Sequence, residues 1–149
     1  MEGAVIPEFN KVGTLPQGFH VGTWDEIVEA FGGNRVREDL LRGLRRMLER
    51  LGSAGCSLVY IDGSFVTNIE LPGDFDIAYD LDSVDFDKLD PIFFDHKPPR
   101  AAQKALFGGE ALPNVTAADG SVFVEFFLQD KLHPGSLKGI VTIDPRTLL

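Results

Sequence analysis

Two short stretches decide the fold: residues 57–64 read Ser-Leu-Val-Tyr-Ile-Asp-Gly-Ser, and residues 74–80 read Asp-Phe-Asp-Ile-Ala-Tyr-Asp. The first is apolar and β-branched up to its Asp-Gly-Ser end, as expected of a buried strand. The second alternates between bulky apolar residues and small or acidic ones, which is typical of a half-buried strand. Pro72-Gly73 predicts a turn between them. The sequence therefore predicts two strands, the first of which ends at Gly-Ser.

Helices and further strands are predicted on either side of this pair. A Thr-Trp-Asp-Glu capping box opens a helix at Thr23 that ends at Gly32-Gly33. Asn34 caps a second helix, whose apolar residues recur every three or four positions from 35 to 51, and Gly52 ends it.

A third helix is expected from Pro98-Pro99 to Phe107, stopped by Gly108-Gly109. The apolar runs 122–128 and 139–143 predict two more strands. This order of elements predicts an α/β (α+β) protein with a small mixed sheet flanked by helices.

Length and composition predict one domain. The chain has 149 residues, 44% of them hydrophobic, so residues 23–149 can bury a single core, preceded by an arm of low periodicity at 1–22. The single cysteine, Cys56, reads as a small core residue and cannot form an internal disulfide. No secretory signal and no apolar run of roughly 18 residues is evident. We therefore expect a cytoplasmic protein that does not reside in a membrane.

Charge is unevenly distributed along the chain. The formal net charge of −9 argues against general binding to duplex DNA. Residues 62–95 contain ten acidic side chains and one basic one, whereas residues 35–50 contain six arginines and three acids. Two solvated faces that attract each other weakly explain this asymmetry, and so does a site for a divalent cation.

Three features favour the cation site. Asp74 and Asp76 lie two apart in a strand, so both carboxylates face the same side, although the acidic side of such a strand can equally face water. Gly63-Ser64 suits close approach of a phosphate, or it is a plain turn. Glu125 lies inside an apolar run, where it needs an arginine or metal partner unless it faces solvent on an edge strand.

In this order, these motifs resemble the nucleotidyltransferase superfamily with the polymerase-beta-like core. That superfamily has an apolar strand ending in Gly-Ser, then Asp-x-Asp, then an acid on a later strand; the matching positions here are 59–64, 74–76 and 124–126. The likeness spans residues 55–128. The start Ile-Pro-Glu-Phe-Asn at 6–10 also resembles that of a set of small bacterial proteins, and this second likeness implies no activity.

The resemblance implies metal-dependent transfer of a nucleotidyl group from a nucleoside triphosphate to an unknown acceptor, which is a protein, an RNA or a small molecule. Gly63 and Ser64 would hold the phosphates, and Asp74, Asp76 and Glu125 would be the catalytic residues that bind Mg²⁺ or Mn²⁺. Arg100 and Lys104 lie one helical turn apart and are candidates for the triphosphate, although such a pair on an exposed helix is often simply solvated.

The chain departs from better-known small members of the superfamily at Asp62, which precedes Gly-Ser, and in having no arginine after it. No helical acceptor domain follows, so the chain is either a catalytic subunit whose acceptor is held by a partner or a degenerate copy. The alternative function is a non-catalytic binding protein, antitoxin-like or inhibitory, that presents the acidic residues 62–95 to a basic surface. The three histidines lack ligand spacing, which disfavours a zinc site.

Overall fold

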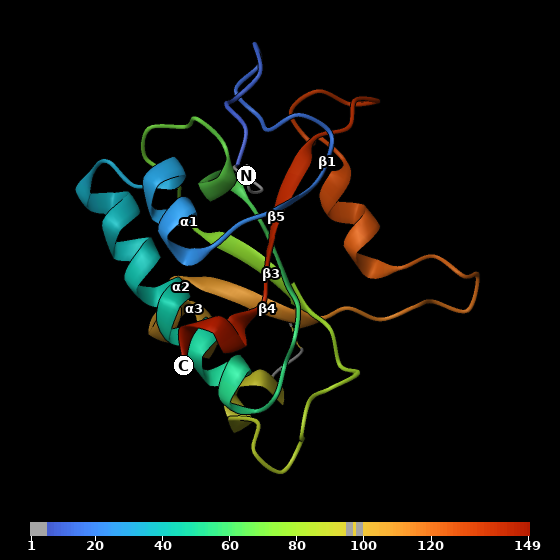
Figure 1. Cartoon of the computed structure of the whole chain (residues 1–149). Helices are drawn as coiled ribbons and strands as arrows, with labels where there is room; N and C mark the ends of the chain where they lie inside the picture. Colours follow the sequence, from blue (N-terminus) through green and yellow to red (C-terminus); the bar gives the residue numbers. More distant parts are fainter. Residues whose placement is uncertain (1–5, 95–96, 98–99) are drawn as a thin grey trace, which may run out of the picture.

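The structure, a computed structural model, describes residues 6–94, 97 and 100–149 (Figure 1). Five strands form one mixed sheet in the order β1-β5-β2-β3-β4. The central strand β2 is antiparallel to both of its neighbours, and the edge strands β1 and β4 pair in parallel. The strands are β1 (Gly18–Val21), β2 (Val59–Asp62), β3 (Phe75–Tyr79), β4 (Gly109–Pro113) and β5 (Gly139–Ile143). The predicted α+β class with a small mixed sheet is confirmed.

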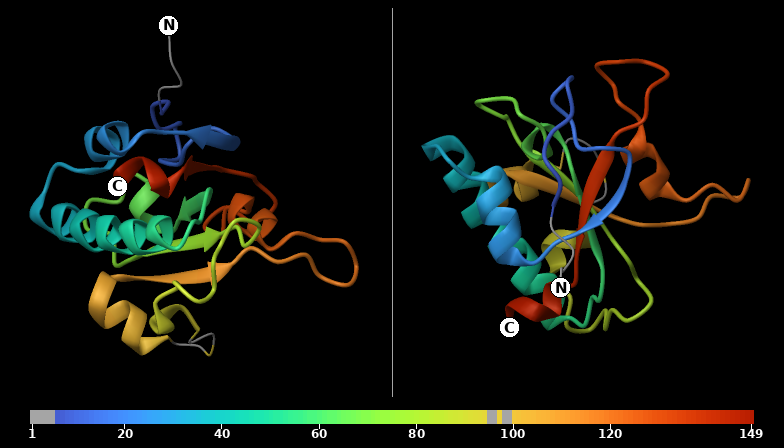
Figure 2. Two further views of the ribbon diagram at one scale, coloured as in Figure 1. Left: turned by 60° about the horizontal axis from the view of Figure 1, so that its bottom comes forward. Right: turned by 45° about the horizontal axis from the view of Figure 1, so that its top comes forward.

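Helices cover one face of the sheet, as both views of Figure 2 show for α1 and α2. These helices are α1 (Trp24–Phe31), α2 (Arg35–Ser53), α3 (Ala101–Phe107) and the 3₁₀ helix η4 (Pro145–Leu148). The Thr23–Glu26 capping box and the Asn34 cap are both present. Pro98-Pro99, the expected start of the third helix, lies outside the described residues. None of the helices in the described part of the chain is long and apolar enough to cross a membrane.

Two glycines let α2 lie close to other backbone. A Cβ on Gly43 would stand 1.6 Å from the carbonyl oxygen of Phe107, at the end of α3, and one on Gly52 would stand 2.6 Å from the carbonyl oxygen of Pro145. The helix therefore continues through Gly52 to Ser53, and the prediction that Gly52 ends it is wrong. Close approach, rather than helix termination, explains this glycine.

The opposite face of the sheet carries η3 (Phe123–Leu128), a 3₁₀ helix. The strand predicted over 122–128 is therefore wrong. Val124 and Phe127, three residues apart, are buried in a second apolar cluster with Ala78 of β3 and Ile140 of β5. A 3₁₀ helix repeats every three residues, so these two side chains meet the sheet together. A short apolar run does not by itself distinguish this arrangement from a strand.

Both edge strands were absent from the sequence-based prediction. In β1 every second residue is exposed and the others are only half-buried, so the strand has no series of fully buried residues that would identify it in the sequence. β4 begins at Gly109 and ends at Pro113, which an edge strand tolerates and a central strand does not. Because β1 pairs with β5, residues 18–21 of the predicted arm are part of the sheet.

Candidate functional site

Three carboxylates stand in a row across the sheet. The strand register places Asp62 of β2 opposite Asp76 of β3, and Asp76 opposite Glu110 of β4. Residues paired in this way point to the same side. This side is the face opposite α2, because Phe75, Ile77 and Tyr79 of β3 belong to the core that α2 joins. Asp74, directly before β3, lies close enough to Asp76 to repel its charge.

Two members of the row have their own cations. The Asp62 carboxylate pairs with the Lys138 ammonium, and both side chains are about nine-tenths buried. Glu110 Oε1 lies 3.4 Å from Arg100 Nη1 and 3.8 Å from Lys104 Nζ. Within the described residues, neither Asp74 nor Asp76 forms an ion pair. The centre of the row is therefore the part that lacks a counter-charge.

The missing counter-charge shows in the acidity of Asp76. Burial, followed by repulsion from Asp74, Asp62 and Glu110, raises the pKa of Asp76 to about 6, and attraction to Lys131 offsets only part of this. Burial also raises the pKa of Asp62, although Lys138 opposes it. Carboxylates whose charge is unfavourable in the empty site are ones that a bound cation would stabilise.

Asp62, Asp74 and Asp76 line a pocket of about 300 Å³. Three loops gather at this end of the sheet, at residues 10–15, 67–73 and 129–138, as the right-hand view of Figure 2 shows. The lining consists of Thr14, Asp62, Gly63, Ser64, Thr67, Ile69, Asp74, Asp76, Gln129, Asp130, Lys131, Leu132 and Lys138. The Gly-Ser loop and the Asp-x-Asp strand, predicted to act together, do meet in one cavity.

Gly63 is required where β2 leaves the sheet. Its φ is +94°, a value that side chains other than hydrogen disfavour, and a Cβ there would stand 3.1 Å from the Asp76 amide nitrogen. The glycine thus lets the loop pass directly beside β3. Ser64 then opens the short helix η1 (Ser64–Val66), and its hydroxyl makes only a long contact of 3.5 Å with the Asp74 carbonyl. The hydroxyl can exchange this contact for a ligand.

Arg37 of α2 anchors the loop that follows Ser64 from the helix-covered side. Its buried guanidinium donates to the carbonyl of Phe31 at the end of α1, at 3.0 Å. It also donates to three carbonyls of the segment that follows Ser64, those of Phe65, Thr67 and Ile69, at 2.6 to 2.8 Å. Burial lowers the pKa of Arg37. One side chain therefore fixes four carbonyls and ties the pocket loop to the helical layer.

The residues before β1 brace the same loop from the other side. Thr14 forms an isolated β-bridge with Thr67, and the Asn68 amide donates to the Gly13 carbonyl at 2.9 Å. Thr14 is buried and lines the pocket. Part of the predicted arm is thus a wall of the site.

Three of the predicted site residues do not reach the pocket. Glu125 is exposed on η3, and its Oε1 accepts a hydrogen bond from the Val122 amide at 2.9 Å, which caps its own helix. The partner expected for this carboxylate is therefore local backbone, because the run is not a strand. Arg100 and Lys104 face Glu110 and do not line the cavity.

Other pocket residues were missed from the sequence. Lys131, Lys138 and Asp130 come from the segment 129–138, and only Lys138 carried a signal, as a charged residue directly before the fully buried strand β5. The Asp130 carboxylate accepts hydrogen bonds from the Leu132 amide and from His133 Nδ1, at 3.0 and 2.8 Å, so it organises its own loop. Arg37 was missed because nothing in the sequence distinguishes it from the other arginines of α2.

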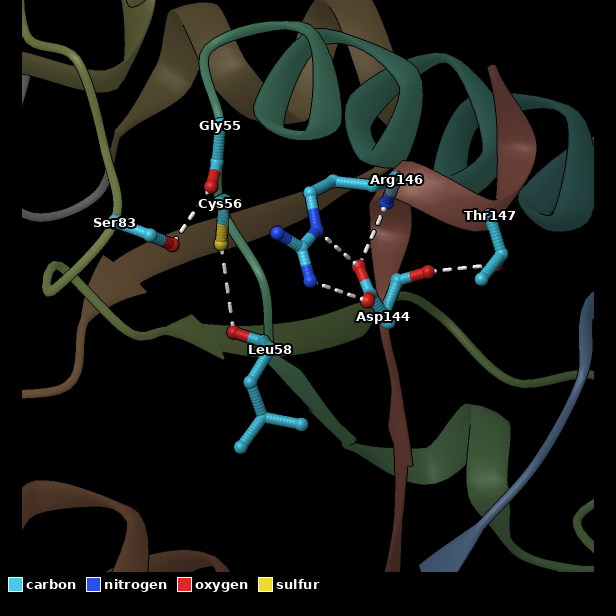
Figure 3. Close-up of polar contacts among 7 residues, drawn as sticks. All are labelled: Gly55, Cys56, Leu58, Ser83, Asp144, Arg146 and Thr147. Atoms are coloured by element: carbon cyan, nitrogen blue, oxygen red, sulfur yellow. Dashed lines mark hydrogen bonds and ion pairs between the residues drawn. The ribbon is translucent and has the colours of Figure 1, made fainter.

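Cys56 takes no part in this site. Its buried thiol lies 3.4 Å from the Leu58 carbonyl, before the start of β2, whereas the pocket lies at the end of that strand. Figure 3 shows it with Ser83 and Asp144. Burial raises the pKa of Cys56 to about 11, so the thiol stays protonated and unreactive at neutral pH. The prediction that Cys56 is a core residue is confirmed.

The fold and the pocket define an α+β protein whose mixed sheet carries an acidic pocket at one end. The chain belongs to DUF6932, a family of unknown function whose model matches residues 7–144. No curated protein and no solved structure matches the chain. The likeness to nucleotidyltransferases therefore remains a prediction.

Proposed function

We propose that the chain binds a nucleoside triphosphate together with Mg²⁺ or Mn²⁺ in this pocket and transfers its nucleotidyl group to an acceptor. One observation carries the proposal: Asp74 and Asp76 lack a counter-ion in the described structure, whereas Asp62 and Glu110 beside them are both paired. The uncompensated pair lines the same cavity as Gly63 and Ser64. This arrangement supports a site for a cation next to a phosphate.

The donors fit a magnesium–nucleotide complex better than a free ion. In the described part of the chain, no three His, Cys, Asp or Glu side chains are arranged to hold a metal. Mg²⁺ commonly uses one or two carboxylates and completes its shell with water and substrate phosphates. Asp74 and Asp76 supply these two carboxylates. Affinity for Mg²⁺ alone should therefore be weak, and affinity for Mg²⁺ with a nucleotide should be much stronger.

The residues in and around the pocket then have defined roles. Gly63 allows a phosphate to approach the backbone, Ser64 offers its hydroxyl to a phosphate oxygen, and Arg37 keeps the loop from moving away. Asp74 and Asp76 orient the cation beside that loop. A bound divalent cation supplies charge stabilisation to phosphate oxygens during a displacement at phosphorus.

Thermal unfolding with each nucleoside triphosphate, with and without Mg²⁺, tests the proposal, because a ligand of the native state raises the melting temperature. We expect a metal-dependent rise for at least one nucleotide and its loss in Asp76→Asn. Asp82→Asn, at an exposed position, removes the same charge as a matched control. Absence of a rise with every nucleotide would refute the proposal.

Glu125→Gln separates the structure-based site from the one implied by the resemblance. If Glu125 were the third metal ligand, this variant would lose the nucleotide response as Asp76→Asn does. With Glu125 capping η3 outside the pocket, the response should survive.

A second candidate function rests on the loop that follows β3. Asp82, Asp85 and Asp87 are all exposed there and do not line the pocket. Such a surface suits a non-catalytic partner that docks on a basic protein. Its binding would weaken steadily with added salt and ignore nucleotide, which distinguishes it from the enzyme. For either function we propose a cytoplasmic location, where a free thiol such as Cys56 stays reduced.

A further inference from the structure

The carboxylates of the pocket face two lysines on one segment, residues 129–138, which we call the lysine segment. Lys138 is buried and Lys131 is exposed, and both line the cavity. The backbone of the segment is fixed by a β-bridge between Gln129 and Leu137 and by a 2.8 Å hydrogen bond from the Lys138 amide to the Leu128 carbonyl. The two lysines therefore lie on a segment whose ends are anchored by backbone hydrogen bonds.

Lys138 has only one ionic partner in the described structure, the Asp62 carboxylate. A buried ion pair adds little net stability, because desolvating both charges costs about as much as their attraction returns. A pair of this kind at a pocket wall is therefore well suited to exchange. A ligand that carries more negative charge than one carboxylate could displace Asp62 from Lys138.

We infer that Lys138 is the phosphate-binding residue of the pocket and that Asp62 holds it until a polyphosphate chain takes its place. This inference rests on the proposed function, and it replaces Arg100 and Lys104, which Glu110 already binds outside the cavity. Lys131, at the exposed end of the same wall, is positioned to meet a second phosphate. The ligand class is a chain of phosphates, either in a nucleoside triphosphate or as inorganic tripolyphosphate.

The charge of the pocket makes the exchange depend on a cation. Four aspartates and two lysines line the cavity, a formal charge of −2, so a polyanion entering alone is repelled. A divalent ion at Asp74 and Asp76 removes this repulsion, and it also compensates Asp62 once Lys138 has turned to the phosphate. Phosphate and metal should therefore each raise the affinity for the other.

Isothermal titration calorimetry with magnesium tripolyphosphate tests the inference on the full chain. Lys138→Met alone would leave the buried Asp62 carboxylate without a partner, which destabilises the fold. The informative comparison is therefore Asp62→Asn against the double variant Asp62→Asn/Lys138→Met. Asp62→Asn keeps an amide oxygen that accepts a hydrogen bond from Lys138 but removes the negative charge that holds it, so this variant should bind about tenfold more tightly than the unaltered chain. The double variant should then lose about 10- to 100-fold, the usual range for a charge-assisted hydrogen bond. Lys88→Met, an exposed lysine outside this pocket, is the matched control and should bind like the unaltered chain.

Equal affinity of Asp62→Asn and the double variant would overturn the inference, and so would absence of tripolyphosphate binding to the unaltered chain. Nucleoside triphosphates, titrated in parallel, separate this outcome from failure of the proposed function. If tripolyphosphate binds through Lys138 but no nucleoside triphosphate binds, the inference stands and the proposed nucleotidyl transfer fails. If a nucleotide binds with Mg²⁺ and the double variant binds it as tightly as Asp62→Asn does, the inference fails and the proposed function stands.

Discussion

The two faces of the sheet are built from the same strands and differ in what they bury. Toward α2, β3 presents Phe75, Ile77 and Tyr79, all essentially inaccessible to solvent. Toward the other side it presents Asp76 and then Ala78, so a carboxylate with a raised pKa lies two residues from an apolar contact with η3. The residues that β3 presents to the helices pack in the core, whereas the pocket end of the opposite face has carboxylates without a counter-ion.

This contrast has an energetic meaning. Substitutions of the buried residues on the helix-covered face should cost stability, because these side chains pack together in one apolar core. Removing an uncompensated acid from the pocket face should instead increase stability, since natural proteins tolerate such strain where function requires it. Substitutions on the two faces should therefore change the free energy of unfolding in opposite directions, and those with the largest expected effect come first.

The largest effect is expected from Gly43→Ala in α2. Alanine normally stabilises a helix interior relative to glycine by about 1 kcal/mol. Here its Cβ would stand 1.6 Å from the backbone oxygen of Phe107, which no change of side-chain rotamer can relieve. We expect a loss of about 4 kcal/mol in the free energy of unfolding, measured by urea denaturation.

Gly73→Ala is the matched control for this substitution, because no atom lies within 4 Å of the added methyl group and φ is not positive there. It should change stability by less than about 0.5 kcal/mol. A Gly43→Ala variant as stable as this control would mean that α2 and α3 are not packed as closely as described.

Arg37→Met tests the side chain that ties the pocket loop to the helical layer. It would leave four carbonyls without their donor, three of them in the segment that shapes the pocket. We expect a loss of about 3 kcal/mol in the free energy of unfolding, together with loss of any ligand response at temperatures where the variant is folded. Both quantities can be followed in one set of thermal unfolding scans.

Arg42→Met is the control, since its side chain is 67% exposed on the same helix. It should leave both the stability and the ligand response close to those of the unaltered chain. Retention of the ligand response in folded Arg37→Met would show that the Gly-Ser loop keeps its shape without this support.

The sequence predicted the elements whose burial follows a regular period. The stripe of α2 and the alternation of β3 each bury one side of an element, and such patterns can be read from residue order alone. The edge strands β1 and β4 are half-buried or irregular, so they carry no comparable pattern.

The candidate site was predictable only where it lies on such elements. Gly63, Asp74 and Asp76 follow from the strands that carry them, and the structure brings them together. Lys138 meets Asp62 across 76 residues of sequence, and Arg37 meets Ile69 across 32, so neither contact can be inferred from local spacing. Glu125 was misassigned because its apolar neighbours suit a strand and a 3₁₀ helix equally well.

In contrast to Gly43→Ala and Arg37→Met, Asp76→Asn should increase the free energy of unfolding in the absence of divalent ions. The pKa of Asp76 is raised from 3.8 to about 6 by burial and by the neighbouring acids, so the folded state favours the protonated form. Stability from protonation is fully present below pH 3.8 and is lost as the pH rises through 6. At pH 7.5 the charged carboxylate should therefore cost up to about 3 kcal/mol, which asparagine avoids.

Thermal unfolding of both proteins in EDTA between pH 4 and pH 8 measures this difference. The gain of Asp76→Asn should be near zero at the acidic end, grow between pH 4 and pH 6, and reach roughly 4 to 8 °C in melting temperature above that. Asp82→Asn should give no such pH-dependent gain, because that residue is exposed. A gain that is absent, or equal at all pH values, would show that Asp76 is not an uncompensated carboxylate. The distinction between the two faces would then lose its electrostatic basis.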